Sequence, residues 1–254
     1  MRSHTGRVDA KGDLIKPKAK GVAWNLAEKI FFAALLIWTA AGLFFTIGRI
    51  TMADIACWPV PAELRSFVEI CLQTGDPILI LLAFANTHLH AARQWSSAIA
   101  RRWGLIVLVC AFGIETLGAI TGFPFGDYRY TDRFGPVLGV VPLVIPLAWH
   151  VVATNALFVI RAAAPHASRL AEAALAGLLC ALYDFVLEPF ATTVKHYWIW
   201  TGGTIPPLNY AAWFVLSGLL VRLFAPTLSS RFRFDPRPAL ILCLTILIFV
   251  AGEF

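Results

Sequence analysis

Charged residues are scarce in this chain: 14% of its 254 residues are Asp, Glu, Lys or Arg, while 59% are hydrophobic. Soluble domains are about 25% charged and about 45–50% apolar, so this composition argues against a soluble globular protein. It indicates instead an integral membrane protein forming one domain. The formal net charge of +6 does not indicate nucleic-acid binding, because the Lys and Arg residues lie in an N-terminal tail and at the ends of apolar runs.

The sequence also lacks the patterns that define several other classes. Its five cysteines are scattered without a CxxC pair, which argues against a disulfide framework. No HxxxH or HxxHH motif occurs, and a di-iron desaturase or oxygenase needs many converging histidines, so we expect no metal site. No lysine follows Lys195, which excludes a retinal Schiff base in the last apolar run.

Seven apolar runs are long enough to suggest membrane-spanning helices. They cover residues 27–48, 74–90, 103–122, 136–160, 170–190, 206–225 and 238–252. We predict an all-α polytopic membrane bundle of about seven transmembrane helices, with residues 22–254 forming a single transmembrane domain. Residues 1–21 are polar and basic and lack the apolar core of a signal peptide, so we predict a disordered cytoplasmic tail.

Lys and Arg residues are distributed unevenly between the two sides of this bundle. The tail and the loops at 91–103, 161–169 and 222–237 hold fifteen of the 21, whereas the opposite loops hold five. Positive residues favour the cytoplasmic side, so the N-terminus is predicted to lie inside and the C-terminus outside. We expect a multi-pass protein of the cell inner (plasma) membrane.

With this orientation, carboxylic residues gather in the outer half of the membrane or just beyond it: Glu115, Asp127, Asp184 and Glu188. An ionisable group in hydrocarbon is costly and usually functional. Asp184 and Glu188 are four residues apart and share one helix face. Two carboxyl groups held close in a low dielectric tend to share one proton, which supplies an acid and a base.

Each of these residues also has a structural interpretation. Glu115 could pair with His150, which lies near the middle of the fourth run, and His150 itself could be only a packing residue. Asp127 could cap its turn or pair with Arg129. Glu188 could be solvated among lipid headgroups.

Aromatic residues follow the fifth run in the segment Tyr197-Trp198-Ile199-Trp200 and continue to Trp213. They are typical of an interfacial aromatic belt. They could equally form a pocket wall, because aromatic faces stabilise cations such as a carbocation made by protonating an alkene.

Together these motifs resemble the carotenoid 1',2'-hydratase family, which includes the bisanhydrobacterioruberin hydratases. The matching residues are Glu115-x-x-Gly118-x-x-Thr121-Gly122-x-Pro124-Phe125-Gly126-x-Tyr128-x-Tyr130, Pro142, Trp149, Asp184-x-x-x-Glu188-Pro189, Tyr197-Trp198-x-Trp200 and Ile205-Pro206-x-x-Asn209-Tyr210-x-x-Trp213. The resemblance covers roughly residues 70–225. Two positions depart from the family pattern: Glu188 stands where Asp is expected before proline, and Tyr210 where Phe is expected.

The resemblance implies a carotenoid-modifying enzyme that adds water to the terminal C1',2' double bond of an acyclic end group, such as that of lycopene or γ-carotene. The product would be a tertiary alcohol, formed by acid–base catalysis without a cofactor. The predicted catalytic residues are Glu115, Asp184, Glu188, Asp127 and His150. The predicted substrate-binding residues are Phe125, Tyr128, Tyr130, Trp149, Tyr197, Trp198, Trp200, Asn209 and Trp213.

Three other functions remain open at this stage. A carotenoid end-group cyclase or isomerase would use the same acids. A transporter or proton relay would also need buried acids, but we see no inverted repeat and few polar residues in the inner half. A non-enzymatic carotenoid-binding protein would leave its pigment unchanged. The sequence does not indicate an oligomeric state.

Overall fold

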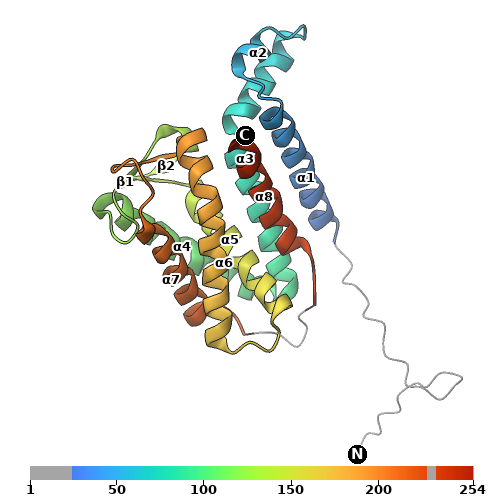
Figure 1. The fold of residues 1–254 in the computed structure, drawn as a ribbon. Helices are drawn as coiled ribbons and strands as arrows, with labels where there is room; N and C mark the ends of the chain where they lie inside the picture. The colour runs from blue at the N-terminus through green and yellow to red at the C-terminus, as the bar shows by residue number, and fades with distance from the viewer. Residues whose placement is uncertain (1–24, 228–232, 254) are drawn as a thin grey trace, which may run out of the picture.

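A computed structural model of the protein describes residues 25–227 and 233–253 (Figure 1). The helices are α1 (Leu26–Ile47), α2 (Met52–Ala56), α3 (Ala62–Gln94), α4 (Ser97–Thr121), α5 (Val144–Ala163), α6 (Arg169–Pro189), α7 (Pro207–Phe224) and α8 (Arg237–Glu253). Shorter elements are β1 (Tyr128–Tyr130), η1 (Asp132–Phe134), β2 (Val137–Leu138), β3 (Val141–Pro142), the π-helical turn η2 (Phe190–Val194) and β4 (Trp198–Trp200). The predicted helical membrane bundle is confirmed. The tail predicted at residues 1–21 lies outside the described residues.

Within the described ranges, six helices are long and apolar enough to cross a membrane: α1, α3, α4, α5, α6 with η2, and α7. Helix α8 has 17 residues. At 1.5 Å per residue this is about 26 Å, slightly less than the roughly 30 Å of a bilayer core. The chain is therefore a multi-pass membrane protein, while the seventh span and the orientation stay predictions.

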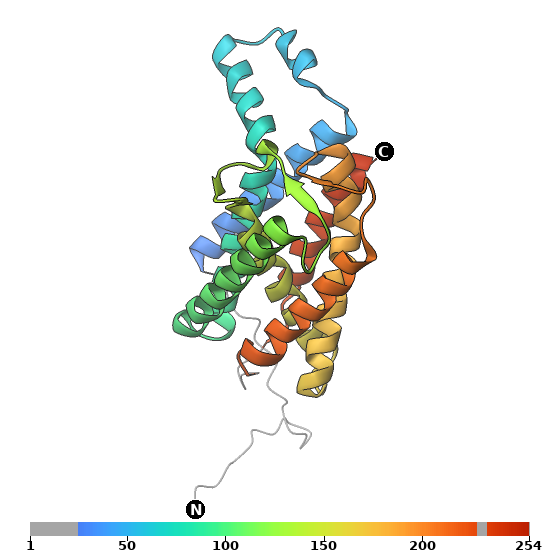
Figure 2. The ribbon, with the colours of Figure 1, turned by 90° about the vertical axis from the view of Figure 1, so that its left-hand side faces the viewer.

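Helix α5 lies in the middle of the bundle, and the other long helices surround it (Figures 1 and 2). In its apolar window 78% of the residues are buried, against 11–39% in the other five spans. Small residues such as Ala153 and Ala156 let α3, α4, α6 and α8 pack around it. The surrounding helices expose apolar side chains such as Leu105, Val109 and Leu223, as expected for surfaces that face lipid.

Three helix starts differ from the predicted apolar runs, and α4 begins at Ser97 rather than near residue 103. Helix α3 begins at Ala62 rather than near residue 74, because a helix can continue through polar residues beyond the hydrocarbon, where a hydropathy window no longer detects it. Helix α5 begins at Val144 rather than near residue 136. The preceding residues form the β2–β3 hairpin, whose turn includes Gly139 at φ 63°, a conformation that glycine adopts without strain.

A two-stranded antiparallel ribbon covers one end of the bundle (Figure 2). Its strands β1 and β4 pair Tyr128 with Trp200 and Tyr130 with Trp198. Side chains alternate along a strand, so these four aromatic residues point toward one face of the ribbon. The intervening Arg129 and Ile199 point the other way and are exposed.

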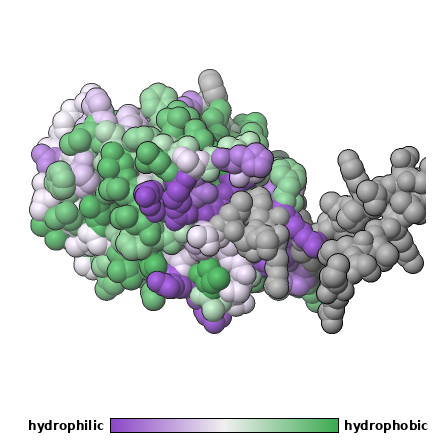
Figure 3. Space-filling model, turned by 90° about the horizontal axis from the view of Figure 1, so that it is seen from below, coloured by the Kyte–Doolittle hydropathy of each residue, from purple (hydrophilic) through white to green (hydrophobic). Residues whose placement is uncertain are grey.

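At the opposite end, hydrophilic side chains gather in the middle of the surface, with hydrophobic side chains around them (Figure 3). A buried ionic cluster joins three helices near this end. Glu28 Oε1 of α1 forms ion pairs with Arg93 Nε at 3.2 Å and with Arg237 Nη1 at 3.3 Å. Arg237 Nη2 also contacts Asp235 Oδ2 at 2.8 Å. Arg93 forms a further ion pair with Asp235. The cluster therefore fixes α1, α3 and α8 to one another.

Candidate functional site

Glu115 lies on the buried side of α4 and accepts three hydrogen bonds. The phenol groups of Tyr128 and Tyr130 donate to Oε2 at 2.7 and 2.6 Å, and Trp149 Nε1 donates to Oε1 at 2.8 Å. Gly118, one turn further along α4, makes this arrangement possible. A Cβ atom there would lie 2.6 Å from the Phe125 ring and 3.0 Å from the Tyr128 hydroxyl, so a larger residue would have to displace these two side chains from the helix.

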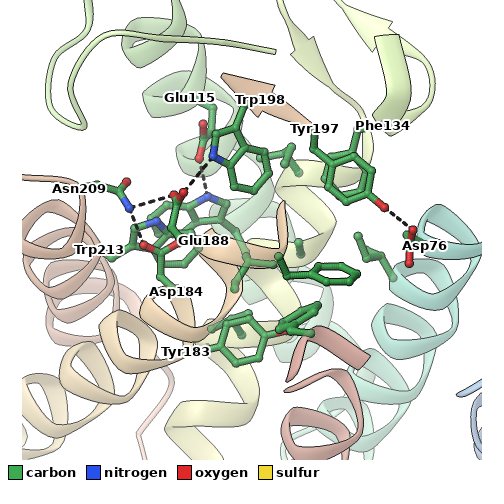
Figure 4. A pocket seen from close by; sticks show the side chains of 18 of the residues that line it. Asp76, Glu115, Phe134, Tyr183, Asp184, Glu188, Tyr197, Trp198, Asn209 and Trp213 are labelled. Carbon is green, nitrogen blue, oxygen red and sulfur yellow. Dashed lines mark hydrogen bonds between the residues drawn. The ribbon is translucent and has the colours of Figure 1, made fainter. Parts of the chain in front are cut away.

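Asp184 and Glu188 occupy adjacent turns of α6 and face the same neighbour on α7. The side-chain amide of Asn209 donates to Asp184 Oδ2 at 2.6 Å and to Glu188 Oε1 at 3.1 Å (Figure 4). The other oxygen of Glu188, Oε2, accepts from the indoles of Trp198 at 3.1 Å and Trp200 at 3.0 Å. All three polar residues are at most 3% exposed. The predicted juxtaposition of the two acids is therefore present in the fold.

The β1–β4 ribbon supplies four of the donors to these acids, two tyrosines to Glu115 and two tryptophans to Glu188. Burial raises the pKa of both Tyr128 and Tyr130 well above the usual phenol value, and the neighbouring Glu115 raises it further. The phenols therefore stay protonated and act as hydrogen-bond donors. An indole N–H is also only a donor. The ribbon thus presents four hydrogen-bond donors to Glu115 and Glu188.

One cavity of about 100 Å³ brings the acids and aromatic residues together. A single water needs roughly 10–15 Å³ by the same kind of measure, so the cavity can admit an organic group. Trp149 and Trp213 form one wall, stacked with ring centroids 3.9 Å apart and planes 8° apart. Apolar residues of α3, α5 and α6, including Leu79, Val152 and Leu187, complete the lining. The interior therefore combines carboxyl groups with an otherwise mostly aromatic and aliphatic surface.

The structure places most of the predicted site residues on this cavity. Its lining includes Glu115, Asp184 and Glu188 together with Phe125, Tyr128, Tyr130, Trp149, Tyr197, Trp198, Trp200, Asn209 and Trp213. Their juxtaposition is a feature of the fold, and their catalytic and binding roles stay predictions.

The lining does not include Asp127 or His150. The Asp127 carboxylate lies over the C-terminal end of α4, next to the left-handed Gly122, where a Cβ atom would meet Asp127 Oδ1 at 2.1 Å. His150 contacts the Thr154 hydroxyl at 3.4 Å and packs against the rings of Phe84 and His88, which belong to α3. Neither residue is placed to act on a group held in the cavity.

Several lining residues were not among the predicted site residues: Asp76, Phe134, Tyr183, Phe190, Thr245 and Phe249. Phe134 stacks on Tyr197 with ring centroids 3.9 Å apart, and the Tyr197 hydroxyl donates to Asp76 on α3 (Figure 4). Asp76 begins an apolar run and so carries a detectable signal. No sequence pattern separates the others from ordinary core residues.

Comparisons with known proteins agree with this site. Residues 75–252 match the model of a family described as carotenoid biosynthesis protein, a range that includes every cavity residue named above. Over 199 residues the chain is 30% identical to a bisanhydrobacterioruberin hydratase of Haloarcula japonica. The alignment covers 73% of this chain and 63% of that relative, so the chain spans less than two thirds of the relative's length. No solved structure matches the chain. From the family match, which extends over more than half of its residues, we conclude that this chain belongs to the carotenoid biosynthesis protein family.

Proposed function

We propose that the protein adds water to the terminal C1',2' double bond of an acyclic carotenoid end group, giving a tertiary alcohol. The family and the hydratase relative support a carotenoid substrate. The observation that carries the proposal is a single cavity whose lining combines the carboxyl groups of Glu115, Asp184 and Glu188 with stacked indoles, in a bundle that can receive its substrate from lipid. We place the protein in the plasma membrane and take lycopene or γ-carotene as the type of substrate.

Asp184 is the proposed proton donor. A carboxyl oxygen that carries a proton is poorly placed next to an N–H group, which can only donate, and such groups face both oxygens of Glu188 and Oε1 of Glu115, while Oε2 of Glu115 already accepts from two phenols. Asp184 accepts one hydrogen bond from the described residues, at Oδ2. Its Oδ1 atom is therefore the carboxyl oxygen best suited to hold a proton and deliver it to an alkene.

Aromatic side chains would hold the cation that this proton transfer creates. Protonation at the less substituted carbon leaves a tertiary carbocation, which gains from the negative faces of aromatic rings. Trp149 and Trp213 present a stacked indole pair to the cavity, and Trp198 and Trp200 lie beside Glu188. The charged carboxylates of Glu115 and Glu188 would add electrostatic stabilisation from fixed positions.

Glu188 is the proposed base that directs the water. Water attacks the cation through its oxygen, and one water proton passes to the Glu188 carboxylate. The amide of Asn209 bridges Glu188 and Asp184, which keeps the acid that loses a proton next to the one that gains it. Transfer of that proton back to Asp184 restores the starting state. The reaction adds H and OH without a net change in electrons, so the proposed chemistry requires no redox cofactor.

Expression in bacteria that accumulate lycopene tests this function. We expect extracted pigment to gain the mass of one water per modified end group, and no gain in cells that express Asp184→Asn. Pigment of unchanged mass but altered chromatographic retention would indicate that the protein catalyses cyclisation or isomerisation and not hydration. Pigment that copurifies unchanged would assign the protein a binding role instead.

A further inference from the structure

A second cavity, of about 290 Å³, lies between α1, α3 and α8. Its lining is largely apolar and includes Ile37, Phe45, Phe67, Val68, Leu72 and Ile248. Ile37 and Phe67 are 70% and 61% exposed, so one edge of the cavity opens on the outer surface of α1 and α3, where lipid would lie. The cavity is therefore accessible from the side of the bundle.

This lipid-side cavity adjoins the acid cavity. Asp76 and Leu79 of α3 line both of them. The Asp76 carboxylate accepts a hydrogen bond from Tyr197, which lines the acid cavity, and contacts Lys195 Nζ at 2.8 Å, which lines the lipid-side cavity. Figure 4 shows Tyr197 and Asp76 meeting at the α3 side of the acid cavity. These three residues form a polar group at the place where the two apolar spaces adjoin.

The two cavities differ in what they could bind. The acid cavity holds about 100 Å³, enough for the end of a long molecule but not for the rest. The lipid-side cavity is larger, and among the described residues that line it Asp76 is the single carboxylic one, already engaged by Lys195 and Tyr197. Apolar and aromatic walls without a free acid suit a hydrocarbon chain that is held but not altered.

We propose that the lipid-side cavity binds the polyene chain of the molecule whose end group occupies the acid cavity, and that this molecule enters from the bilayer between α1 and α3. This inference rests on the proposed function for the identity of the ligand as a long acyclic polyene. It assigns α1, which lies outside the residues that match the family model, a part in substrate binding.

Gly75 allows a sharp test. It lines the lipid-side cavity, and a Cβ atom built there meets nothing within 4 Å. Gly75→Leu should therefore add side-chain volume to the cavity from a Cβ position that meets no other atom, and it keeps the backbone carbonyl that accepts from Trp38 Nε1 at 2.8 Å. Gly113→Leu is the matched control, because Gly113 is also helical, is exposed on α4 and has nothing within 4 Å of its Cβ position.

Two readouts separate this inference from the proposed reaction. The first is the amount of polyene pigment that copurifies with each variant from lycopene-accumulating cells. The second is turnover of lycopene compared with a short isoprenoid that carries the same end group. We expect Gly75→Leu to lower bound lycopene and its turnover by about tenfold or more, with the short compound unaffected, and Gly113→Leu to match the wild type.

Equal pigment binding by Gly75→Leu and the wild type would overturn the inference, and so would a wild type that binds no pigment. Pigment binding that Gly75→Leu abolishes, in a protein whose pigment stays unhydrated, would support the inference while contradicting the proposed reaction. If Gly75→Leu lowered turnover of the long and the short compound equally, this result would also contradict the inference, since the short compound does not reach the lipid-side cavity.

Discussion

Tyr128 and Trp200 face each other across the β1–β4 ribbon, with ring centroids 5.2 Å apart, and each donates a hydrogen bond to a different acid. Tyr128 donates to Glu115 of α4, and Trp200 donates to Glu188 of α6. Two carboxyl groups that belong to different helices therefore depend on one short ribbon for their polar surroundings.

Replacing the proposed proton donor should abolish conversion. Asp184→Asn keeps the shape of the side chain but removes its acidic proton. A general acid commonly increases the reaction rate by about 10²–10⁴-fold. We expect product in lycopene-accumulating cells to fall by at least about 100-fold, with bound pigment retained. Glu115→Gln should also stop conversion, since it removes a fixed negative charge. Full activity in both variants would show that the acids are structural.

His150 provides a contrasting position on α5. It is fully buried, but it packs toward α3 and does not line the acid cavity. We expect His150→Gln to leave product yield per folded protein unchanged, measured beside the yield of Asp184→Asn. A loss of conversion as large as that of Asp184→Asn, in protein that still binds pigment, would give His150 a catalytic role.

The ribbon donors should stabilise the fold as well as the site. Tyr128→Phe removes one of three hydrogen bonds to Glu115, and hydrogen bonds to charged groups contribute about 1.5–3 kcal/mol. We expect a decrease in the free energy of unfolding of that order, measured in detergent, together with slower conversion. Phe134→Leu alters the same cavity without removing a donor and serves as the control. Unchanged stability and activity in Tyr128→Phe would show that this donor is dispensable.

Close packing of α6 against α7 depends on Gly177. A Cβ atom there would lie 2.4 Å from the Phe214 carbonyl oxygen and 3.1 Å from the Gly218 nitrogen, both backbone atoms that cannot move without shifting α7. We expect Gly177→Ala to lower thermal stability and to displace Asn209 from the two acids. Gly113→Ala should be neutral or stabilising by up to about 1 kcal/mol, as expected for glycine replaced in a helix. Equal thermal stability of Gly177→Ala and Gly113→Ala would contradict the close approach of α6 and α7 at Gly177.

Acid should weaken the ionic cluster through Asp235. Burial raises the pKa of Asp235, but hydrogen bonds from Arg237 together with the charges of His90 and Arg237 lower it by more, so the folded-state pKa lies well below its usual value. Stabilisation by this group is then present above the unfolded pKa of about 3.9 and is lost as the pH falls toward the folded value. We expect Asp235→Asn to be less stable than the wild type at pH 7, with a difference that shrinks below about pH 4. A pH-independent difference would contradict this linkage.

The carboxyl groups and aromatic residues of the site could be predicted because each carries a local signal. Glu115, Asp184 and Glu188 stand out within apolar runs, and the four-residue spacing of the last two places them on one helix face. The aromatic residues near Trp198 and Trp213 stand out by their density. For these residues, type and spacing alone indicated a shared location, and the fold brings them together.

The direction in which a side chain points was harder to predict. Trp149 and His150 are adjacent in sequence and lie at the same membrane depth, but consecutive helical residues point about 100° apart, so only Trp149 reaches the acid cavity. The β1–β4 pairing joins segments about 70 residues apart and depends on tertiary contacts. Sequence spacing therefore indicated which acids share a helix face but not the ribbon that completes the site.

Four of the hydrogen-bond donors to Glu115 and Glu188 belong to a single ribbon. The hydrogen bonding of one acid therefore cannot change without changing that of the other. A displacement of β1 and β4 would withdraw phenol and indole hydrogens from Glu115 and Glu188 at the same time. Each acid would then keep one of its three donors, Trp149 for Glu115 and Asn209 for Glu188. The hydrogen bonding of both acids would consequently change in one movement, coupled through six residues of paired strand.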